Sequence, residues 1–260
     1  MKVFVILHTM SWAQKRKFIY IGSIVIIFLL VVVLPIIIHF YKPPTCFDNK
    51  QNGDELGVDC GGFCQLLCPA QYAPLNVLWT RFFKVDDGVY NALAYIENSN
   101  LNAGADNVNY VFRLYSKDGI LLKERYGQTF ASPNKIMAIF EPELQTGYQI
   151  PARVEFSFTS KAVWLKQESK ETGLSTSQVV MTRLDSAPRL TAVVSNNTIN
   201  DIKNIEAVGI IYNTDGNTVA FSRTIISSIN GKGSQEINFN WPKPFGDTYA
   251  RTEIVLKVLK

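Results

Sequence analysis

The most continuous hydrophobic pattern in the chain is an apolar run near its start. Residues 18–40 read FIYIGSIVIIFLLVVVLPIIIHF and contain no Lys, Arg, Asp or Glu. At roughly 1.5 Å of rise per residue this run makes a helix of about 34 Å, enough to cross the hydrocarbon core of a bilayer. A cleaved signal peptide would have a shorter apolar core that ends in a small-residue site. The run therefore predicts one uncleaved transmembrane helix over residues 18–41.

Beyond residue 71 the pattern changes to short β-rich segments separated by turn residues. Arg113 and Tyr115 alternate with Phe112 and Leu114, as expected of a strand, and Asp-Gly pairs at 118–119 and 215–216 are typical of hairpin turns. The predicted strands are 77–85, 90–97, 109–115, 120–128, 135–140 and 152–159, and then 177–183, 190–195, 205–213, 218–226, 234–240 and 249–257. No amphipathic helical pattern of useful length follows residue 70, so this region is all-β.

The two groups of six strands repeat one pattern. LAYIENSN at 93–100 aligns with TAVVSNNT at 191–198, FRLYSKDG at 112–119 with GIIYNTDG at 209–216, and ARVEFSF at 152–158 with ARTEIVL at 250–256. These matches have nearly one offset, which indicates a duplicated module, and six or seven short strands per copy are typical of an immunoglobulin-like sandwich. We therefore predict an all-β ectodomain of two immunoglobulin-like β-sandwich modules in tandem, at 71–165 and 177–260, with a polar linker at 166–176.

Two kinds of residue in the β region have expected structural roles. Trp79, Trp164 and Trp241 are expected to fill the sandwich cores or the junction between the modules. Asn196 begins an N-glycosylation sequon, but it also occupies the repeated position of Asn98, at the end of a predicted strand. The repeat favours a turn-forming role for both asparagines.

All four cysteines of the chain, Cys46, Cys60, Cys64 and Cys68, lie in a Gly- and Asn-rich segment at 42–70. An even number of cysteines in a short extracytoplasmic segment indicates two disulfides, and the sequence leaves three pairings open. The alternative is zinc, but the spacing C-x13-C-x3-C-x3-C lacks the C-x2-C pairs of ordinary structural zinc sites. We predict a disulfide-stapled segment, because its few apolar side chains cannot form a core of their own.

The same segment contains part of a calcium-loop pattern. Positions 1, 5, 7 and 12 of such a loop are occupied by Asp48, Asn52, Asp54 and Asp59, and Gly53 stands at position 6, where these loops turn sharply. Lys50 stands at position 3, where an oxygen ligand belongs, and no helical pattern flanks the loop. The alternative is that these side chains bond to the backbone in turns around glycines. Calcium is therefore the only candidate cofactor that the sequence indicates.

The charge distribution sets the expected orientation of the helix. Residues 1–41 contain four basic residues and no acid, and residues 42–260 contain 22 basic and 22 acidic residues. The cluster Lys15-Arg16-Lys17 precedes the apolar run, so the positive-inside rule predicts a cytoplasmic tail at 1–17 and an extracytoplasmic region beyond the helix. That region has no net charge, so the composition indicates no nucleic-acid partner.

Few catalytic groups are present. The only histidines are His8 and His39, so the region beyond the helix has no Ser-His or Cys-His pair and no His-ligated metal site. No G-x-S-x-G, Walker, dinucleotide or H-E-x-x-H motif occurs. The closest acidic pairs, Asp86-Asp87 and Glu141 with Glu143, are expected in turns and on solvent faces. We predict a protein that is not an enzyme, with a carboxylate-dependent hydrolase as the remote alternative.

Two segments resemble known sequence motifs. FRLYSKDG, and more loosely GIIYNTDGNTVA with the later FNWPKPF, resemble the F-x-L-Y-D class of small β-sandwich modules on bacterial envelope proteins, although Ser116 stands where that signature has Asp. CFDNKQNGDELGVDCGGFC resembles a Cys-rich VDCGGxC-type motif of extracellular proteins. The whole order resembles that of uncharacterised membrane-anchored bacterial envelope proteins. This resemblance implies an envelope location and β-sandwich modules, and it implies no particular activity.

These observations predict a single-pass cell-membrane protein whose extracytoplasmic modules bind or scaffold. Its expected partners are the membrane, through one span, and an envelope protein or glycan that docks on sheet edges or between the modules. The alternative function is that of a structural subunit in a cell-envelope assembly of secretion or pilus type.

Overall fold

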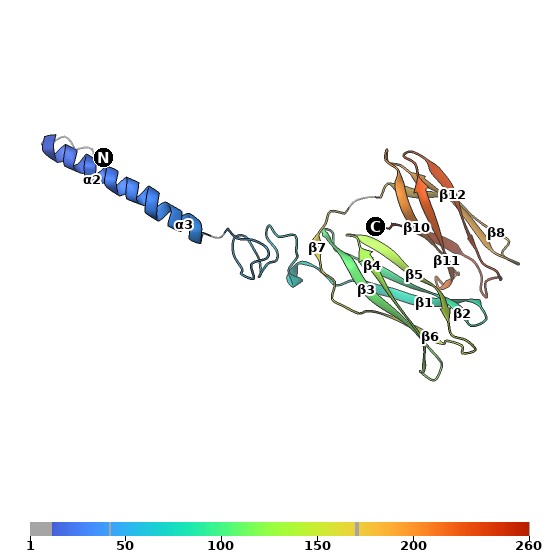
Figure 1. The fold of residues 1–260 in the computed structure, drawn as a ribbon. Coiled ribbons are helices and arrows are strands. Elements are labelled where there is room, and N and C mark those ends of the chain that lie inside the picture. Colours follow the sequence, from blue (N-terminus) through green and yellow to red (C-terminus); the bar gives the residue numbers. More distant parts are fainter. Residues whose placement is uncertain (1–11, 42, 170–171, 260) are drawn as a thin grey trace. The chain divides into compact units, whose positions relative to one another are not determined.

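The computed structural model describes residues 12–41, 43–169 and 172–259 (Figure 1). The chain divides into two compact units, Met1–Asp59 and Cys60–Lys260. The first unit contains an apolar helix followed by a turn-rich segment, and the second contains two β-sandwiches. The predicted fold class, an all-β region behind one N-terminal helix, is confirmed. Residues 1–11 of the predicted cytoplasmic tail lie outside the described residues.

The helix of the first unit is long and apolar enough to cross a membrane, as an anchor or a signal sequence would be. It consists of α2 (Trp12–Phe28), a π-helical segment η1 (Leu29–Val33) and α3 (Leu34–Phe40). The π-helical segment η1 lies just before Pro35. Proline has no N–H, and its ring crowds the carbonyl group four residues earlier. The N–H of Leu34 accordingly bonds to the oxygen of Leu29, five residues earlier.

The first sandwich contains two antiparallel sheets. Its strands are β1 (Asn76–Asp86), β2 (Val89–Asn98), β3 (Ala103–Tyr115), β4 (Leu121–Ala131), β5 (Lys135–Gln145) and β6 (Arg153–Phe158). One sheet has the order β1-β2-β5 and the other β4-β3-β6, and the short β7 (Leu165–Lys166) pairs with the start of β3. The inner faces form a core around Ile96, Phe112 and Leu114, each fully buried.

The second sandwich repeats this topology. Its strands are β8 (Leu174–Thr182), β9 (Arg189–Asn196), β10 (Ile202–Tyr212), β11 (Thr218–Ile229), β12 (Ser234–Asn240) and β13 (Arg251–Val258). Its sheets have the orders β12-β9-β8 and β11-β10-β13. In both copies the first, second and fifth strands share one sheet, and the third and sixth pair in the other, as in immunoglobulin-like sandwiches. Each of the twelve predicted strands overlaps one of these strands.

The repeated asparagines close the same loops in the two sandwiches. The Asn98 Nδ2 donates to the carbonyl oxygens of Ala103, at 2.9 Å, and Ser132, at 2.8 Å. The Asn196 Nδ2 donates to those of Asn200, at 2.7 Å, and Ile229, at 3.1 Å. Both side chains are 1% exposed. The turn-forming role is confirmed, and a glycan on Asn196 would have to break these bonds.

A disulfide loop is attached to the first sandwich. Cys60 and Cys68 form a disulfide, and the N–H of Leu67, within that loop, donates to the carbonyl of Trp164 at 2.9 Å. The Leu67 side chain packs into the first core. Cys46 and Cys64 are also disulfide-bonded, so all four cysteines are oxidised as predicted.

Candidate functional site

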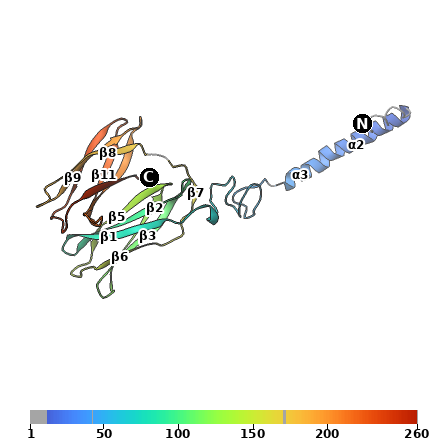
Figure 2. The ribbon, with the colours of Figure 1, turned by 180° about the vertical axis from the view of Figure 1, so that it is seen from behind.

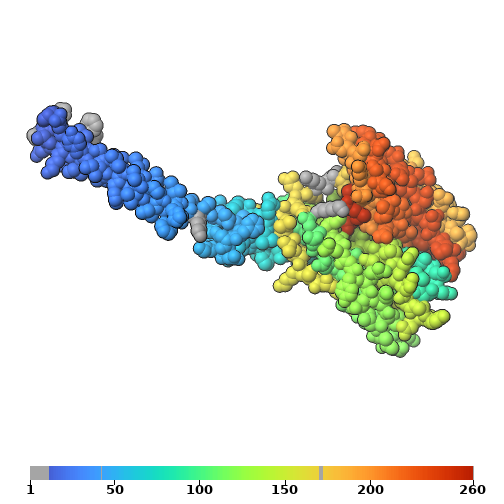
Figure 3. Space-filling view, viewed as in Figure 1, coloured from blue at the N-terminus to red at the C-terminus, as the bar shows by residue number. Residues whose placement is uncertain are grey.

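The two sandwiches share a third hydrophobic core where one sheet of each meets the other. The outer face of β1-β2-β5 contacts the outer face of β11-β10-β13, and the two sandwiches lie side by side in both ribbon views (Figures 1 and 2). The buried side chains are Leu93, Tyr95, Ala138 and Phe140 from the first sandwich and Val208, Ile210, Tyr212 and Phe221 from the second. In Figure 3 the orange and red atoms of the second sandwich lie against the green atoms of the first. This core joins the two modules into one unit.

The central strands of this junction are buried on both faces. Residues 92–96 of β2 and 205–212 of β10 are all buried, because alternate side chains point into their own sandwich and into the junction. Strands covered on both faces read as continuous apolar runs. The stretches LAYI and AVGIIY carry that signal in the sequence, and it could have predicted which strands form the junction.

A carboxylate from the second sandwich connects the two modules at this junction. Glu253 accepts hydrogen bonds from the hydroxyl of Tyr95, on β2 of the first sandwich, and from the hydroxyl of Tyr212, at 2.9 Å. Trp79 stacks on the Tyr95 ring with centroids 4.8 Å apart, and the Arg251 guanidinium lies 3.7 Å from the Tyr212 ring centroid. A charged acceptor shared by two partly buried hydroxyls fixes the register of the two sheets.

Removing the charge of this carboxylate tests the connection. We expect Glu253→Gln to lower the free energy of unfolding by about 1–2 kcal/mol, because hydrogen bonds to a charged acceptor are stronger than those to a neutral one. Glu155→Gln is the matched control, since Glu155 holds the equivalent repeat position and pairs with Arg153 on the exposed side of the first sandwich. Urea unfolding measures both changes, and equal losses in the two variants would contradict the assignment.

The same tyrosines predict a dependence on alkaline pH. Burial raises the pKa of the Tyr95 and Tyr212 hydroxyls above its usual value, and the bonded Glu253 adds to the rise. The unfolded chain then loses these protons first, so their contribution to stability is complete below about pH 10 and is lost as the pH rises further. We expect Tyr95→Phe to make the fall of stability above pH 10 less steep, as measured by urea unfolding at a series of pH values. An unchanged slope would contradict this.

A pocket of about 300 Å³ opens beside the junction. Its walls are mostly apolar and come from both sandwiches, with Phe130, Met137, Leu256 and Val258 among them. The charged residues in its lining are Lys135 and Lys257, and the described lining contains no acid. Apolar concave sites with a few polar groups, often between domains, are typical places for small ligands.

Lys257 is the most unusual residue of this pocket. Its ammonium group bonds to the hydroxyl of Thr129 and lies 4.4 Å from the centroid of the Phe130 ring. Burial lowers the pKa of Lys257, and the Glu206 carboxylate partly offsets that shift. Glu206 itself is paired with Arg223 at 3.3 Å. A desolvated ammonium in an apolar wall favours an anionic or carbonyl group as its contact.

The four residues of the partial calcium loop lie in the first unit. The Asp59 carboxylate accepts the N–H groups of Asp48, at 3.0 Å, and Asn49, at 3.0 and 3.2 Å. Asp48 accepts the N–H of Lys50 at 2.9 Å and the Asn52 amide at 2.8 Å, and this amide contact is the main cause that lowers the pKa of Asp48. These bonds form turns, and calcium binding stays a prediction.

The calcium prediction has a direct test. If the loop binds calcium, a calorimetric titration of the detergent-solubilised chain should release heat with a dissociation constant of about 0.1–1 mM, as in extracellular modules. Asp48→Asn should weaken that signal because it removes the charged side-chain ligand at position 1, whereas Asp118→Asn, in the β3–β4 turn, should leave it unchanged. No heat at millimolar calcium would contradict the prediction.

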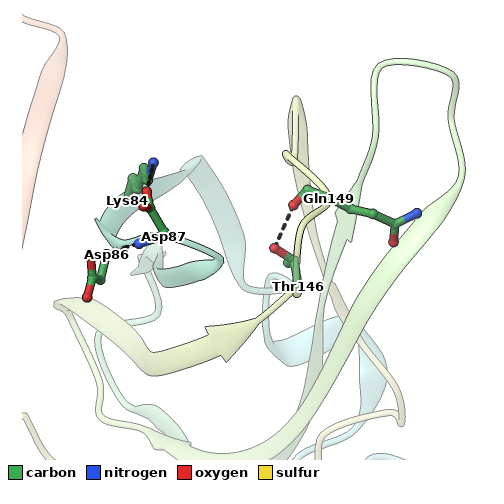
Figure 4. Close-up of polar contacts among 5 residues, drawn as sticks. All are labelled: Lys84, Asp86, Asp87, Thr146 and Gln149. Carbon is green, nitrogen blue, oxygen red and sulfur yellow. Dashed lines mark hydrogen bonds and ion pairs between the residues drawn. The ribbon is translucent and has the colours of Figure 1, made fainter.

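The two acidic pairs have local partners. Asp87 pairs with Lys84 at 2.6 Å, and its own N–H donates to Asp86 at 2.9 Å, in the turn after β1 (Figure 4). The neighbouring β5–β6 loop is closed by a bond from the Thr146 hydroxyl to the Gln149 carbonyl at 2.7 Å (Figure 4).

Glu141 and Glu143 have separate surroundings. Glu141 accepts the Tyr110 hydroxyl at 2.8 Å and lies 3.8 Å from the Arg125 Nε. The N–H of Glu143 donates to the Asn91 side chain at 3.0 Å where β5 is irregular. Among the described contacts, Glu141 therefore stabilises packing and Glu143 stands in a bulge.

The tryptophans lie where the sequence predicts. Trp164 is buried in the first core and Trp241 in the second, and Trp79 packs against the junction. The Trp241 indole N–H donates to the carbonyl of Phe221 at 3.3 Å, which links the second core to the junction strand β11.

No protein-family model and no curated protein matches the chain. Among solved structures, red sea bream transglutaminase matches 71% of this chain with 12% identity, a TM-score of 0.24 and 30% of its own length. Bacteroides uniformis beta-glucuronidase 2 matches 67% of this chain with 14% identity, a TM-score of 0.26 and 25% of its own length. The chain thus spans less than a third of either enzyme, and at such low TM-scores their activities do not transfer to it.

Proposed function

We propose that the chain is a single-pass membrane protein, N-terminus in the cytoplasm, whose two-sandwich unit is a binding or scaffolding ectodomain rather than an enzyme. The basic cluster Lys15-Arg16-Lys17, at the start of α2 and before its apolar run, supports this orientation, and the oxidised cysteines fit an extracytoplasmic compartment. The region beyond residue 39 contains no histidine, which leaves it without histidine-based acid-base catalysis.

The pocket beside Lys257 is the observation that carries the binding role. It combines apolar walls from both sandwiches with two lysines and no described acid in its lining. Its charge and volume suit a small anionic amphiphile, whose apolar part would replace water against Met137 and Leu256 while its anionic group meets Lys257. The ligand then bridges the two modules and stabilises their junction.

A thermal-shift experiment tests this site. We expect decanoate, a short anionic amphiphile, to raise the Tm of residues 43–260 in a saturable manner, because a ligand that binds the folded state stabilises it. This region contains all three cores and all four cysteines. Lys257→Met should abolish the shift, and Lys117→Met, in the exposed β3–β4 turn, should retain it. A shift that is equal in the two variants would contradict a site at Lys257.

The orientation is tested separately on intact cells. Ile199 is 82% exposed in the loop after β9, so a cysteine there is accessible. We expect a membrane-impermeant maleimide to label Ile199→Cys in intact cells. Labelling that requires permeabilised cells would contradict the proposed orientation.

A second candidate function is that of a subunit in a cell-envelope assembly. The observation that favours it is the exposed edge of β8, which pairs on one side with β9 and on the other with no described strand.

A further inference from the structure

β8 differs from every other described strand in its composition. Its sequence is LSTSQVVMT, with no charged residue and no proline, and each other described strand contains at least one charged residue. Charged side chains, especially lysine, are the usual protection of sheet edges against pairing with other chains. β8 is an edge strand of the second sandwich, and it lacks that protection.

The strand is also open to contact. Among the described strands β8 pairs only with β9, so its other edge presents backbone N–H and C=O groups. Residues 175–180 are all exposed, and Val179 and Val180 are 44% and 50% exposed. Exposed β-branched residues on an unpaired edge favour the addition of another strand.

One irregularity determines how such a strand could be added. The register of β8 against β9 shifts between Ser177 and Val180, and Gln178 has a positive φ of 51°. This bulge divides the strand into two regular segments, 174–177 and 180–182. Residue 178 is the midpoint of the nine-residue strand. A bulge at the midpoint suits a partner with the same bulge, because the regular halves can then pair with each other.

We propose that β8 is a self-association edge, which pairs antiparallel with β8 of a second copy of this chain about a twofold axis near Gln178. The strand suits itself as a partner because it has no charges, so no like charges face each other across the axis. This register places Thr176 opposite Val180 of the partner subunit, and β-branched residues pair favourably across strands. Copies held in one membrane also meet at a high effective concentration, which favours a small edge contact.

Crosslinking of the full-length chain in its own membrane tests the pairing. Ser177→Cys places a single free thiol one residue from the proposed axis, since the four native cysteines are oxidised. A short bismaleimide should join two copies of this variant into a product of twice the mass of the chain. Ser234→Cys, on the opposite edge strand β12 of the same sheet, is the matched control and should give at least about fivefold less product, because β12 keeps the charge of Glu236.

A second substitution separates pairing from random collision. Val180→Lys adds a charge to the exposed edge and should lower the Ser177→Cys product at least about fivefold, with the Tm of the sandwiches unchanged. Equal crosslinking at Ser177 and Ser234, crosslinking that survives Val180→Lys, or a product of another mass would overturn the proposal. The pocket beside Lys257 is not involved, so the ligand experiment and this one fail independently.

Discussion

Replacing Phe221 with alanine is expected to lower the free energy of unfolding by about 3–5 kcal/mol, the usual cost of removing a buried aromatic ring. The ring is 2% exposed and lies 6.0 Å from Phe140 and 6.3 Å from Phe83, centroid to centroid, so it fills the centre of the junction. The vacated space cannot collapse easily, because two stiff sheets hold its walls apart. Urea unfolding of residues 43–260 measures the change.

The control for this substitution lies on the same strand. Ile225 is on β11 and 51% exposed, so Ile225→Ala should change stability by no more than about 0.5 kcal/mol. Phe221→Ala should also separate the unfolding of the two sandwiches into two transitions, because their shared core couples them. A loss below about 1 kcal/mol would contradict a packed junction at this ring.

Removing the Cys60–Cys68 disulfide is expected to cost about 2–3 kcal/mol, from the chain entropy of a short loop. The two cysteines are eight residues apart, and their loop holds Leu67 in the first core. We expect Cys60→Ser with Cys68→Ser to lower the Tm of residues 43–260 and to make the loop a site of rapid proteolysis, because its attachment to the sandwich loosens.

Phe63→Ser is the matched control for the disulfide. Phe63 lies in the same loop and is 49% exposed, so this substitution adds a polar side chain and leaves the bond intact. It should leave the Tm nearly unchanged. A double serine variant as stable and protease-resistant as this control would show that the disulfide does not hold the loop.

In the second sandwich the sheet β11-β10-β13 has an apolar outer face, which forms the junction. The equivalent sheet of the first sandwich, β4-β3-β6, has no such apolar face. The repeat positions of Ile210 and Phe221 in the first sandwich are Arg113 and Glu124, which form an ion pair at 2.6 Å. The sheet β4-β3-β6 thus carries charges where its counterpart carries apolar side chains. Burying charged groups costs free energy, so this face is unsuited to the apolar packing that joins the two sandwiches.

Much of the fold was accessible from local patterns. The twelve strands, the duplication, the oxidised cysteines and the buried tryptophans were predicted because each depends on neighbouring residues or on repeated spacing. The junction strands also had a signal, since LAYI and AVGIIY are apolar without interruption. That signal was missed because a continuous apolar run shows only that both faces are covered, and it does not name what covers them.

The candidate site was far less accessible. Tyr95 and Glu253 are 158 residues apart in the chain, and Lys257 and Thr129 are 128 residues apart. Nothing in the spacing of such residues indicates contact, because both pairs depend on which sheet faces meet. Glu141 shows the same effect: it is an ordinary acid in the sequence and the acceptor of a buried tyrosine hydroxyl in the fold.

The sequence by itself determined the apolar helix, the strands, their repetition and the oxidation of the cysteines, since periodicity and composition act over a few residues. Only the tertiary structure decided that the sheet β1-β2-β5 packs on β11-β10-β13, with Glu253 between two tyrosines and Lys257 in an apolar wall. The physical reason is that a hydrophobic pattern indicates which faces are buried, whereas shape and packing determine which surface covers them.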